Sequence, residues 1–260
     1  MFQTSVLASG SKGNSVFIRT ENTAFLLDVG LSGKKIFTLL DSIKINPSVL
    51  KGVIISHEHS DHIRGAGVVC RKLNIPLYIS KKTYTVCAHQ IGKLPLNTIF
   101  FEVGSSFEID DVVIRPFPSS HDVIDGANFI FLQKENKQKL AIVTDAGYSS
   151  KLMLLNLKES STIILESNHD VQMLLNGPYP PHLKQRIKSR QGHLSNDQAV
   201  GVISQILHPG LKNLVLAHLS EKNNLPDLAH KLMSDFLKEM KYKLNLLVSS
   251  QYEATELLDI

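Results

Sequence analysis

The sequence predicts an α/β protein, a four-layer αββα sandwich in which two β-sheets pack face to face between outer helices. Two observations indicate this fold: strand-like apolar segments come in two runs, and helical segments follow each run. The chain has 260 residues, of which 43% are hydrophobic, and this is enough to bury a sizeable core. We expect a single domain over residues 1–260.

The first run opens with apolar segments at residues 4–8, 15–20 and 23–30, separated by the turn-rich sequences SGSKGN and EN. This spacing predicts an antiparallel meander. We then expect a helix over residues 32–43, a fully apolar strand that ends at Ser56, and a single helix over residues 61–73.

The second run comprises the segments NTIFFEV, SFEID, DVVIRPF, ANFIFLQ and KLAIVTD, with breaks at glycine, aspartate, proline and lysine. Strands at STIILE and NLVLA follow, and they alternate with helices over residues 195–207 and 226–240. These later helices can cover the outer face of the second sheet.

The composition of the chain limits the possible functions. No stretch of 18 or more apolar residues occurs, and the opening MFQTSVLASGSKGNS lacks the basic flank and apolar run of a signal peptide. We therefore expect a cytoplasmic protein that does not contact a membrane, and no obligate protein partner is evident. The net charge of +4 permits an anionic substrate but is far below that of a dedicated nucleic-acid-binding arm.

The motif HEHSDH supplies four possible metal ligands within six residues: His57, His59, Asp61 and His62. It follows a buried strand directly, so the first two histidines can point the same way, while Asp61 and His62 begin a helix. Imidazoles suit a borderline-soft divalent ion, and the carboxylate adds a harder second pocket. The alternative is a solvated helix cap, but three histidines and an aspartate rarely gather by chance.

Two metal ions need more ligands than one loop offers. Three residues at the carboxyl ends of later strands meet this need: His121 in SSHD, Asp145 in TDAG and His218 in LAHLS. Each alone could equally be a turn-forming or capping residue. Their order after HEHSDH favours ligation for the set.

Together these motifs resemble those of the metallo-β-lactamase superfamily. The segments LASGSKGNS, ESNHD, GHLSN and LAHLSEKNN further resemble the YycJ (WalJ) subfamily, which is regarded as a group of metal-dependent DNA exonucleases. The resemblance implies the metallo-β-lactamase fold and DNA as substrate. It also implies one metal on His57, His59 and His121, a second on Asp61, His62 and His218, and Asp145 between them.

Such a site hydrolyses its substrate with a hydroxide held between two ions, whose charge lowers the pKa of water. Asp61 is the expected proton acceptor, and His193 or His169 the expected donor to the leaving group. For either histidine, a buried hydrogen-bonded role is an equal alternative. Histidine ligation favours zinc, although the aspartates also allow manganese or iron.

The substrate is predicted from weaker signals. Backbone N–H groups around Ser11 in SGSKGN could bind an anion, although an ordinary hairpin loop is the alternative. On one helix, Arg186 and Arg190 would share a face, and with Lys184 they could bind successive phosphates. A solvated charged helix is the alternative. A thioesterase of the glyoxalase II type, a small cyclic-phosphodiester hydrolase and a non-catalytic metal-binding module are the competing functions.

Overall fold

The computed structural model describes all of residues 1–260, and these form two compact units. Unit 1 comprises Met1–Pro118, Val123–Lys137 and Ser250–Asp259. Unit 2 comprises Ser119–Asp122, Gln138–Ser249 and Ile260. The expectation of a single domain over residues 1–260 stays a prediction. None of the helices has both the length and the apolar composition that crossing a membrane requires.

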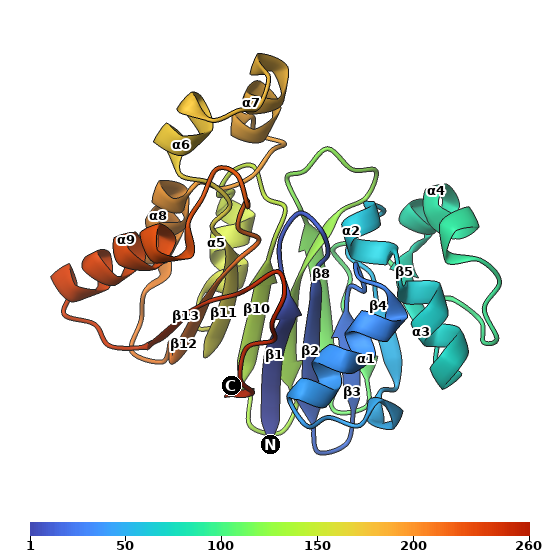
Figure 1. The fold of residues 1–260 in the computed structure, drawn as a ribbon. Helices are drawn as coiled ribbons and strands as arrows, with labels where there is room; N and C mark the ends of the chain where they lie inside the picture. The colour runs from blue at the N-terminus through green and yellow to red at the C-terminus, as the bar shows by residue number, and fades with distance from the viewer. The chain divides into compact units, whose positions relative to one another are not determined.

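The main sheet of unit 1 has seven strands in the order β14-β1-β2-β3-β4-β5-β6 (Figure 1). Their bounds are Phe2–Ala8 for β1, Ser15–Thr20 for β2, Ala24–Leu27 for β3, Gly52–Ile54 for β4, Leu77–Ser80 for β5, Ile99–Phe101 for β6 and Leu258–Asp259 for β14. The first three strands pair antiparallel, which confirms the predicted meander. The pairs from β3 to β6 are parallel.

In the sequence analysis the segment NTIFFEV was assigned to the second run of strands, and this assignment is wrong. The segment NTIFFEV contains β6, which pairs with β5 in the main sheet of unit 1. The helix α4, at Lys81–Ile91, connects these two parallel strands, as a crossover connection requires. Unit 1 also contains strands β7 at Phe107–Ile109, β8 at Val112–Pro118 and β9 at Ala127–Gln133, which pair antiparallel in sequence order.

The helices of unit 1 are α1 at Gly33–Ser42, α2 at Ser60–Ile63, α3 at Ala66–Leu73 and α4, with a 3₁₀ turn at Pro47–Val49. The Ser32 side chain caps α1 by accepting from the Lys35 N–H, so the predicted helix over residues 32–43 is confirmed. The single helix predicted over residues 61–73 is wrong. Gly65 divides it, because its N–H donates to the Val29 carbonyl instead of continuing the helix.

Unit 2 contains four parallel strands in the order β10-β11-β12-β13, all pairing with their neighbours in register. They are β10 at Lys139–Val143, β11 at Thr162–Glu166, β12 at Asn213–Ala217 and β13 at Asn245–Val248. Every residue of β11 and of β12 is buried. This explains their uninterrupted apolar sequences, since helices cover parallel sheets of this kind.

The helices of unit 2 are α5 at Lys151–Leu157, α6 at Val171–Asn176, α7 at Pro181–Lys188, α8 at Asn196–Ile206 and α9 at Pro226–Glu239. Both α8 and α9 lie within one residue of the predicted bounds. A capping box begins α8, in which Ser195 and Gln198 satisfy each other's backbone N–H groups. In Figure 1, α9 runs beside β13, and α6 and α7 lie above the strands.

In both units, polar residues stand where parallel strands end. Asp28 follows β3 and His57 follows β4 in unit 1, while Glu166 ends β11 and His218 follows β12 in unit 2. Since parallel neighbours end at the same edge of a sheet, each unit gathers its polar side chains at one edge. Each edge carries candidate ligand residues.

Candidate metal centre

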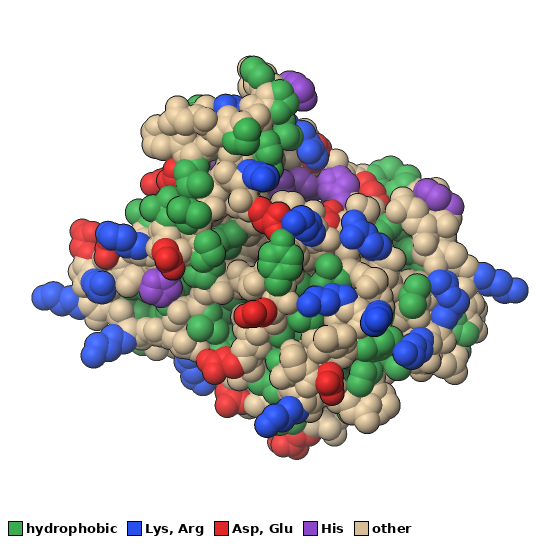
Figure 2. Space-filling model, in the orientation of Figure 1, with side chains coloured by type: hydrophobic (Ala, Val, Ile, Leu, Met, Phe, Trp, Pro, Cys, Tyr) green, Lys and Arg blue, Asp and Glu red, His purple; other side chains and the backbone are tan.

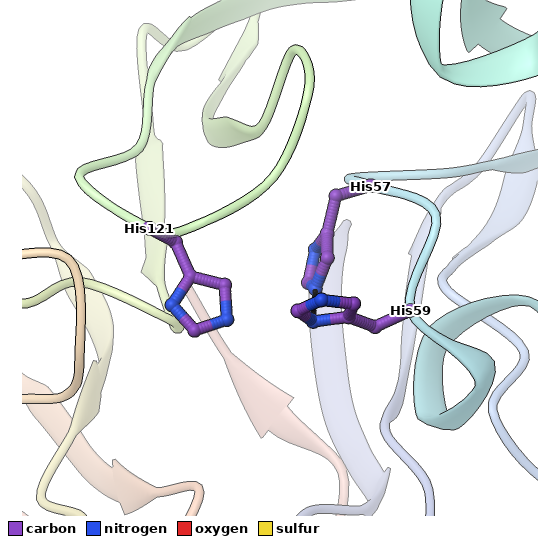
Figure 3. A group of neighbouring side chains, drawn as sticks. All are labelled: His57, His59 and His121. Atoms are coloured by element: carbon purple, nitrogen blue, oxygen red, sulfur yellow. Dashed lines mark hydrogen bonds between the residues drawn. The ribbon is translucent and has the colours of Figure 1, made fainter. Parts of the chain in front are cut away.

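Unit 1 brings together the four candidate ligands of HEHSDH, which we call the first cluster: His57, His59, Asp61 and His62. Figure 3 draws His57 and His59 with the dashed contact that joins them, and His121 of unit 2 is labelled in the same view. The nitrogens His57 Nε2 and His59 Nδ1 lie 3.2 Å apart. A tetrahedral zinc ion holds two imidazole nitrogens about 3.4 Å apart, so this pair is spaced to share one ion.

Hydrogen bonds fix the proton positions on two of these rings. Ser56 Oγ donates to Asp28 Oδ2 at 2.8 Å and accepts from His57 Nδ1 at 2.9 Å. Asp28 Oδ2 also accepts from His62 Nδ1 at 2.8 Å. Both histidines therefore carry their proton on Nδ1 and leave Nε2 unprotonated, as metal-binding histidines do. In this structure Nε2 of His62 lies 3.1 Å from Asn14 Nδ2.

Asp61 is held by its backbone at the start of α2. Its carbonyl accepts from the Asn14 N–H at 2.7 Å, and Asn14 Nδ2 lies 3.3 Å from Asp61 Oδ2. Gly30 permits this approach, since a Cβ at that position would lie 1.6 Å from the Asp61 carbonyl oxygen. The Asp61 side chain keeps 21% of its surface exposed, which leaves it accessible to water and substrate.

Asp28→Asn is expected to weaken metal binding by roughly 10–100-fold. The amide oxygen must face the Ser56 N–H, which now donates to Asp28 Oδ1, so the amide N–H₂ faces His62 Nδ1. That nitrogen then has to accept, which moves the ring proton to Nε2 and removes the lone pair. Competition between the protein and a chromophoric zinc chelator measures the change. Asp41→Asn, on the exposed face of α1, is the matched control, and equal zinc affinity for both variants would contradict the role of Asp28.

Unit 2 brings together the three later ligands, which with His193 and Glu166 form the second cluster. Asp145 Oδ1 lies 3.7 Å from His121 Nε2 and 3.6 Å from His218 Nε2. His121 Nδ1 donates to the carbonyls of Gln191 and Gly192 at 3.1 and 3.2 Å. His121 therefore presents its Nε2 lone pair towards Asp145, in the tautomer that binds metal.

Glu166 lies at the centre of the second cluster and is fully buried. Its Oε1 accepts from His193 Nδ1 at 2.7 Å and from His218 Nδ1 at 2.9 Å. Its Oε2 accepts from the N–H groups of Ala146 and Leu194 at 2.9 and 3.1 Å. Burial by itself raises the pKa of Glu166, but the charges and hydrogen bonds of the two histidines outweigh it and lower the pKa to about 2.

The structure distinguishes the two predicted proton donors. His193 is held through Nδ1 by Glu166, and 16% of its side chain is exposed, so its Nε2 can face a substrate. His169 is 2% exposed, and its Nδ1 has no hydrogen-bond partner. Burial lowers the pKa of His169 to about 4, so this ring is neutral near pH 7 and is a poor proton donor. The geometry favours His193.

The basic segment does not form the predicted helix face. Helix α7 ends at Lys188, and Ser189 is extended, because the Ser189 hydroxyl accepts from the Gln191 N–H and turns the chain. Arg186 is paired with Asp122 through two hydrogen bonds of 2.5 and 2.9 Å. The Lys184 ammonium donates to the Leu175 carbonyl. The shared helix face of Arg186 and Arg190 was therefore a wrong prediction.

The glycine-rich loop, predicted to bind an anion around Ser11, has partners within the protein for several of its backbone N–H groups. Its backbone N–H groups donate within the protein: Gly10 to Asn14 Oδ1, Lys12 to Gln251 Oε1 and Gly13 to the Gly10 carbonyl. These three N–H groups are engaged within the protein, and an anion-binding role for Ser11 stays a prediction. Ser11 lies exposed at the loop tip, and the loop serves to place Asn14 beside Asp61.

Sequence analysis missed Asp28 and Glu166, the two carboxylates that orient the histidines. Each is the sole charge at the end of an apolar strand, in FLLDVG and TIILES. A charge at the end of a strand that is otherwise fully apolar was the available signal, because such a group must be paired when buried. Asp145 was noticed because it stands in the same context.

Comparison with known proteins places this geometry in a class. The profile of the Metallo-beta-lactamase superfamily matches residues 8–132. Among solved structures, the metallo-beta-lactamase fold protein YhfI from Bacillus subtilis covers 98% of each chain with a TM-score of 0.74 and 15% identity. The predicted fold class is therefore confirmed, and the chain is a metal-dependent hydrolase of this superfamily.

Two curated relatives narrow the class. Exodeoxyribonuclease YycJ of Bacillus anthracis is 39% identical over 236 residues, covering 90% of this chain and 89% of the relative. Exodeoxyribonuclease WalJ of Streptococcus pneumoniae is 39% identical over 241 residues, covering 92% of this chain and 89% of the relative. The chain belongs to the YycJ/WalJ family.

Proposed function

We propose that this protein is a cytoplasmic DNA exonuclease that uses two divalent metal ions. The observation that carries the proposal is the preset tautomer of His57, His62, His121 and His218, each of which has its Nδ1 proton engaged by a protein acceptor. Such an arrangement serves metal coordination through Nε2. The exodeoxyribonuclease relatives support DNA as the substrate.

The donor atoms of the two clusters suit two ions. We assign one ion to His57, His59 and His121, and the other to Asp61, His62 and His218, with Asp145 between them. Nitrogen ligands with few carboxylates favour zinc, and manganese or iron are the alternatives that metal analysis of the purified protein distinguishes. When bound, such ions lower the pKa of water and stabilise negative charge on a phosphate.

The remaining residues would handle protons. The Asp61 carboxylate would accept a proton from the attacking water, a role that its partial exposure and its contact with Asn14 support. His193 would deliver a proton from Nε2 to the departing 3′ or 5′ oxygen, with Glu166 stabilising the protonated ring through Nδ1. This pair resembles the carboxylate–histidine arrangement of general acid–base catalysis.

A substrate screen tests the proposal. Metal-reconstituted protein is assayed on labelled single- and double-stranded DNA, RNA, bis-p-nitrophenyl phosphate and S-lactoylglutathione. We expect release of mononucleotides from DNA ends, loss of this activity with a chelator, and its return with zinc or manganese. Turnover of S-lactoylglutathione without cleavage of DNA would favour a thioesterase, and cleavage of cyclic phosphodiesters alone would favour the small-substrate function.

A further inference from the structure

Unit 2 contains a pocket of ≈ 580 Å³ whose lining residues all carry polar groups and come from three segments: residues 119–121, Tyr148 and residues 189–191. Sites for small molecules commonly measure about 300–1,000 Å³. The pocket therefore has room for a ligand the size of one nucleotide. His121, a proposed metal ligand, forms part of its wall.

The three segments are tied together by their backbones. The Gly147 N–H donates to the Ser120 carbonyl at 2.9 Å, and His121 Nδ1 donates to the Gln191 carbonyl at 3.1 Å. A Cβ at Gly147 would lie 2.4 Å from the Arg190 carbonyl carbon, so only glycine allows this approach. The pocket wall and the second cluster are thus built from the same bonded framework.

Arg190 is held ready to bind an anion. Its guanidinium carbon lies 4.1 Å from the centre of the Tyr148 ring, and hydrogen bonds from Arg190 and then Ser120 lower the pKa of the Tyr148 hydroxyl. Stacking on an aromatic ring fixes the plane of a guanidinium. A fixed guanidinium can give two parallel N–H donors to one phosphate.

The charges around the pocket favour a phosphate. No carboxylate lines it, and the nearby Asp122 is neutralised by Arg186 in a two-hydrogen-bond pair. Figure 2 shows that lysine and arginine side chains on the visible face are dispersed and do not form a continuous stripe. On this face, DNA binding would therefore depend on single contacts such as that of Arg190 and not on a continuous row of basic side chains.

We propose that this pocket binds the terminal nucleotide of a DNA strand through its terminal phosphate, with Arg190 and Ser120 as the phosphate donors. The inference rests on the proposed nuclease function and adds a requirement for a phosphorylated end. A pocket that holds one nucleotide beside His121 fixes the distance from the strand end to the scissile bond, which is what exonucleolytic cleavage needs.

The experiment compares three forms of one single-stranded oligonucleotide, with a 5′-phosphate, a 3′-phosphate or hydroxyls at both ends. Binding is measured by fluorescence anisotropy of an internal label with full-length protein in EDTA, and degradation is measured with metal-loaded protein. We expect one phosphorylated form to bind roughly 10-fold more tightly than the hydroxyl form. Arg190→Gln should abolish this preference, while Lys151→Gln, an exposed charge at the start of α5, should retain it.

The outcomes separate the inference from the proposed function. If DNA is degraded with no preference for either phosphate, or if the preference survives Arg190→Gln, the proposal that the pocket binds a terminal phosphate is wrong. The proposed exonuclease function is then unaffected. A preference for one phosphate that disappears in Arg190→Gln supports the pocket, and the preferred form identifies the end that is bound. If that preference is seen but no DNA is degraded, the phosphate-binding proposal is supported and the exonuclease proposal is wrong.

Discussion

Replacing Asp61 with alanine is expected to lower hydrolysis of DNA and of bis-p-nitrophenyl phosphate by roughly 10³-fold. The substitution removes both a proposed ligand and the proposed proton acceptor. Because the Asp61 side chain is 21% exposed and lies outside the apolar core, the free energy of unfolding should change by less than about 1 kcal/mol. Initial rates measure the loss of hydrolysis, and urea denaturation measures the free energy of unfolding. The metal content of the purified variant shows whether a ligand has been lost.

His89→Ala is the matched control, because His89 is an exposed histidine on α4 away from both clusters. Its rates and metal content should equal those of the wild type. An Asp61→Ala protein that retained near wild-type turnover with full metal loading would remove Asp61 from the mechanism. An unfolded variant would instead assign it a structural role.

Glu166→Ala should cause the largest loss of stability, about 3–5 kcal/mol in the free energy of unfolding. The carboxylate accepts from two buried backbone N–H groups, those of Ala146 and Leu194, and from two histidine rings. Alanine leaves all four donors without this acceptor inside the protein. Urea denaturation followed by circular dichroism measures the difference, and Glu239→Ala at the exposed end of α9 should change it little.

Glu166→Gln separates stability from metal binding. The amide oxygen of the introduced glutamine can still accept from the backbone N–H groups of Ala146 and Leu194, so this variant should remain folded. Its N–H₂ group then faces His193 and His218, whose Nδ1 atoms must accept, and the proton of His218 moves to Nε2. We expect a folded protein with weakened metal binding. Wild-type zinc affinity in this variant would contradict the orienting role of Glu166.

Local features of the fold and site were predictable from the sequence. The ligands of HEHSDH lie within six residues, so their spacing alone brought His57 and His59 together. The strand bounds of β2 match the prediction because polar turns flank an apolar run. The later candidate ligands stood out in the sequence because they too follow apolar strands. Their union with the first cluster in one metal site stays a prediction, tested by the metal content of variants in each cluster.

What the sequence did not indicate depends on contacts between distant segments. Gly65 divides a helix because its N–H donates to the carbonyl of Val29, which is distant in the chain. The same segment requires glycine there, since a Cβ would lie 2.1 Å from the Leu31 carbonyl oxygen. The end of α7 at Lys188 is set by a hydroxyl–backbone hydrogen bond that a helical pattern does not contain. Arg186 was assigned to DNA because its partner, Asp122, lies 64 residues away in the sequence.

Three site residues have a left-handed backbone: Asp28 with φ 60°, Asp145 with φ 55° and His218 with φ 58°. Each such residue costs the folded state about 1–3 kcal/mol, and glycine would avoid the cost. Aspartate and histidine are among the few other types that adopt this conformation readily. At these three positions a functional side chain lowers the free energy of unfolding. Selection for heat resistance alone would therefore favour glycine there, at the expense of the site. A thermostabilised version of this enzyme should be sought at other positions.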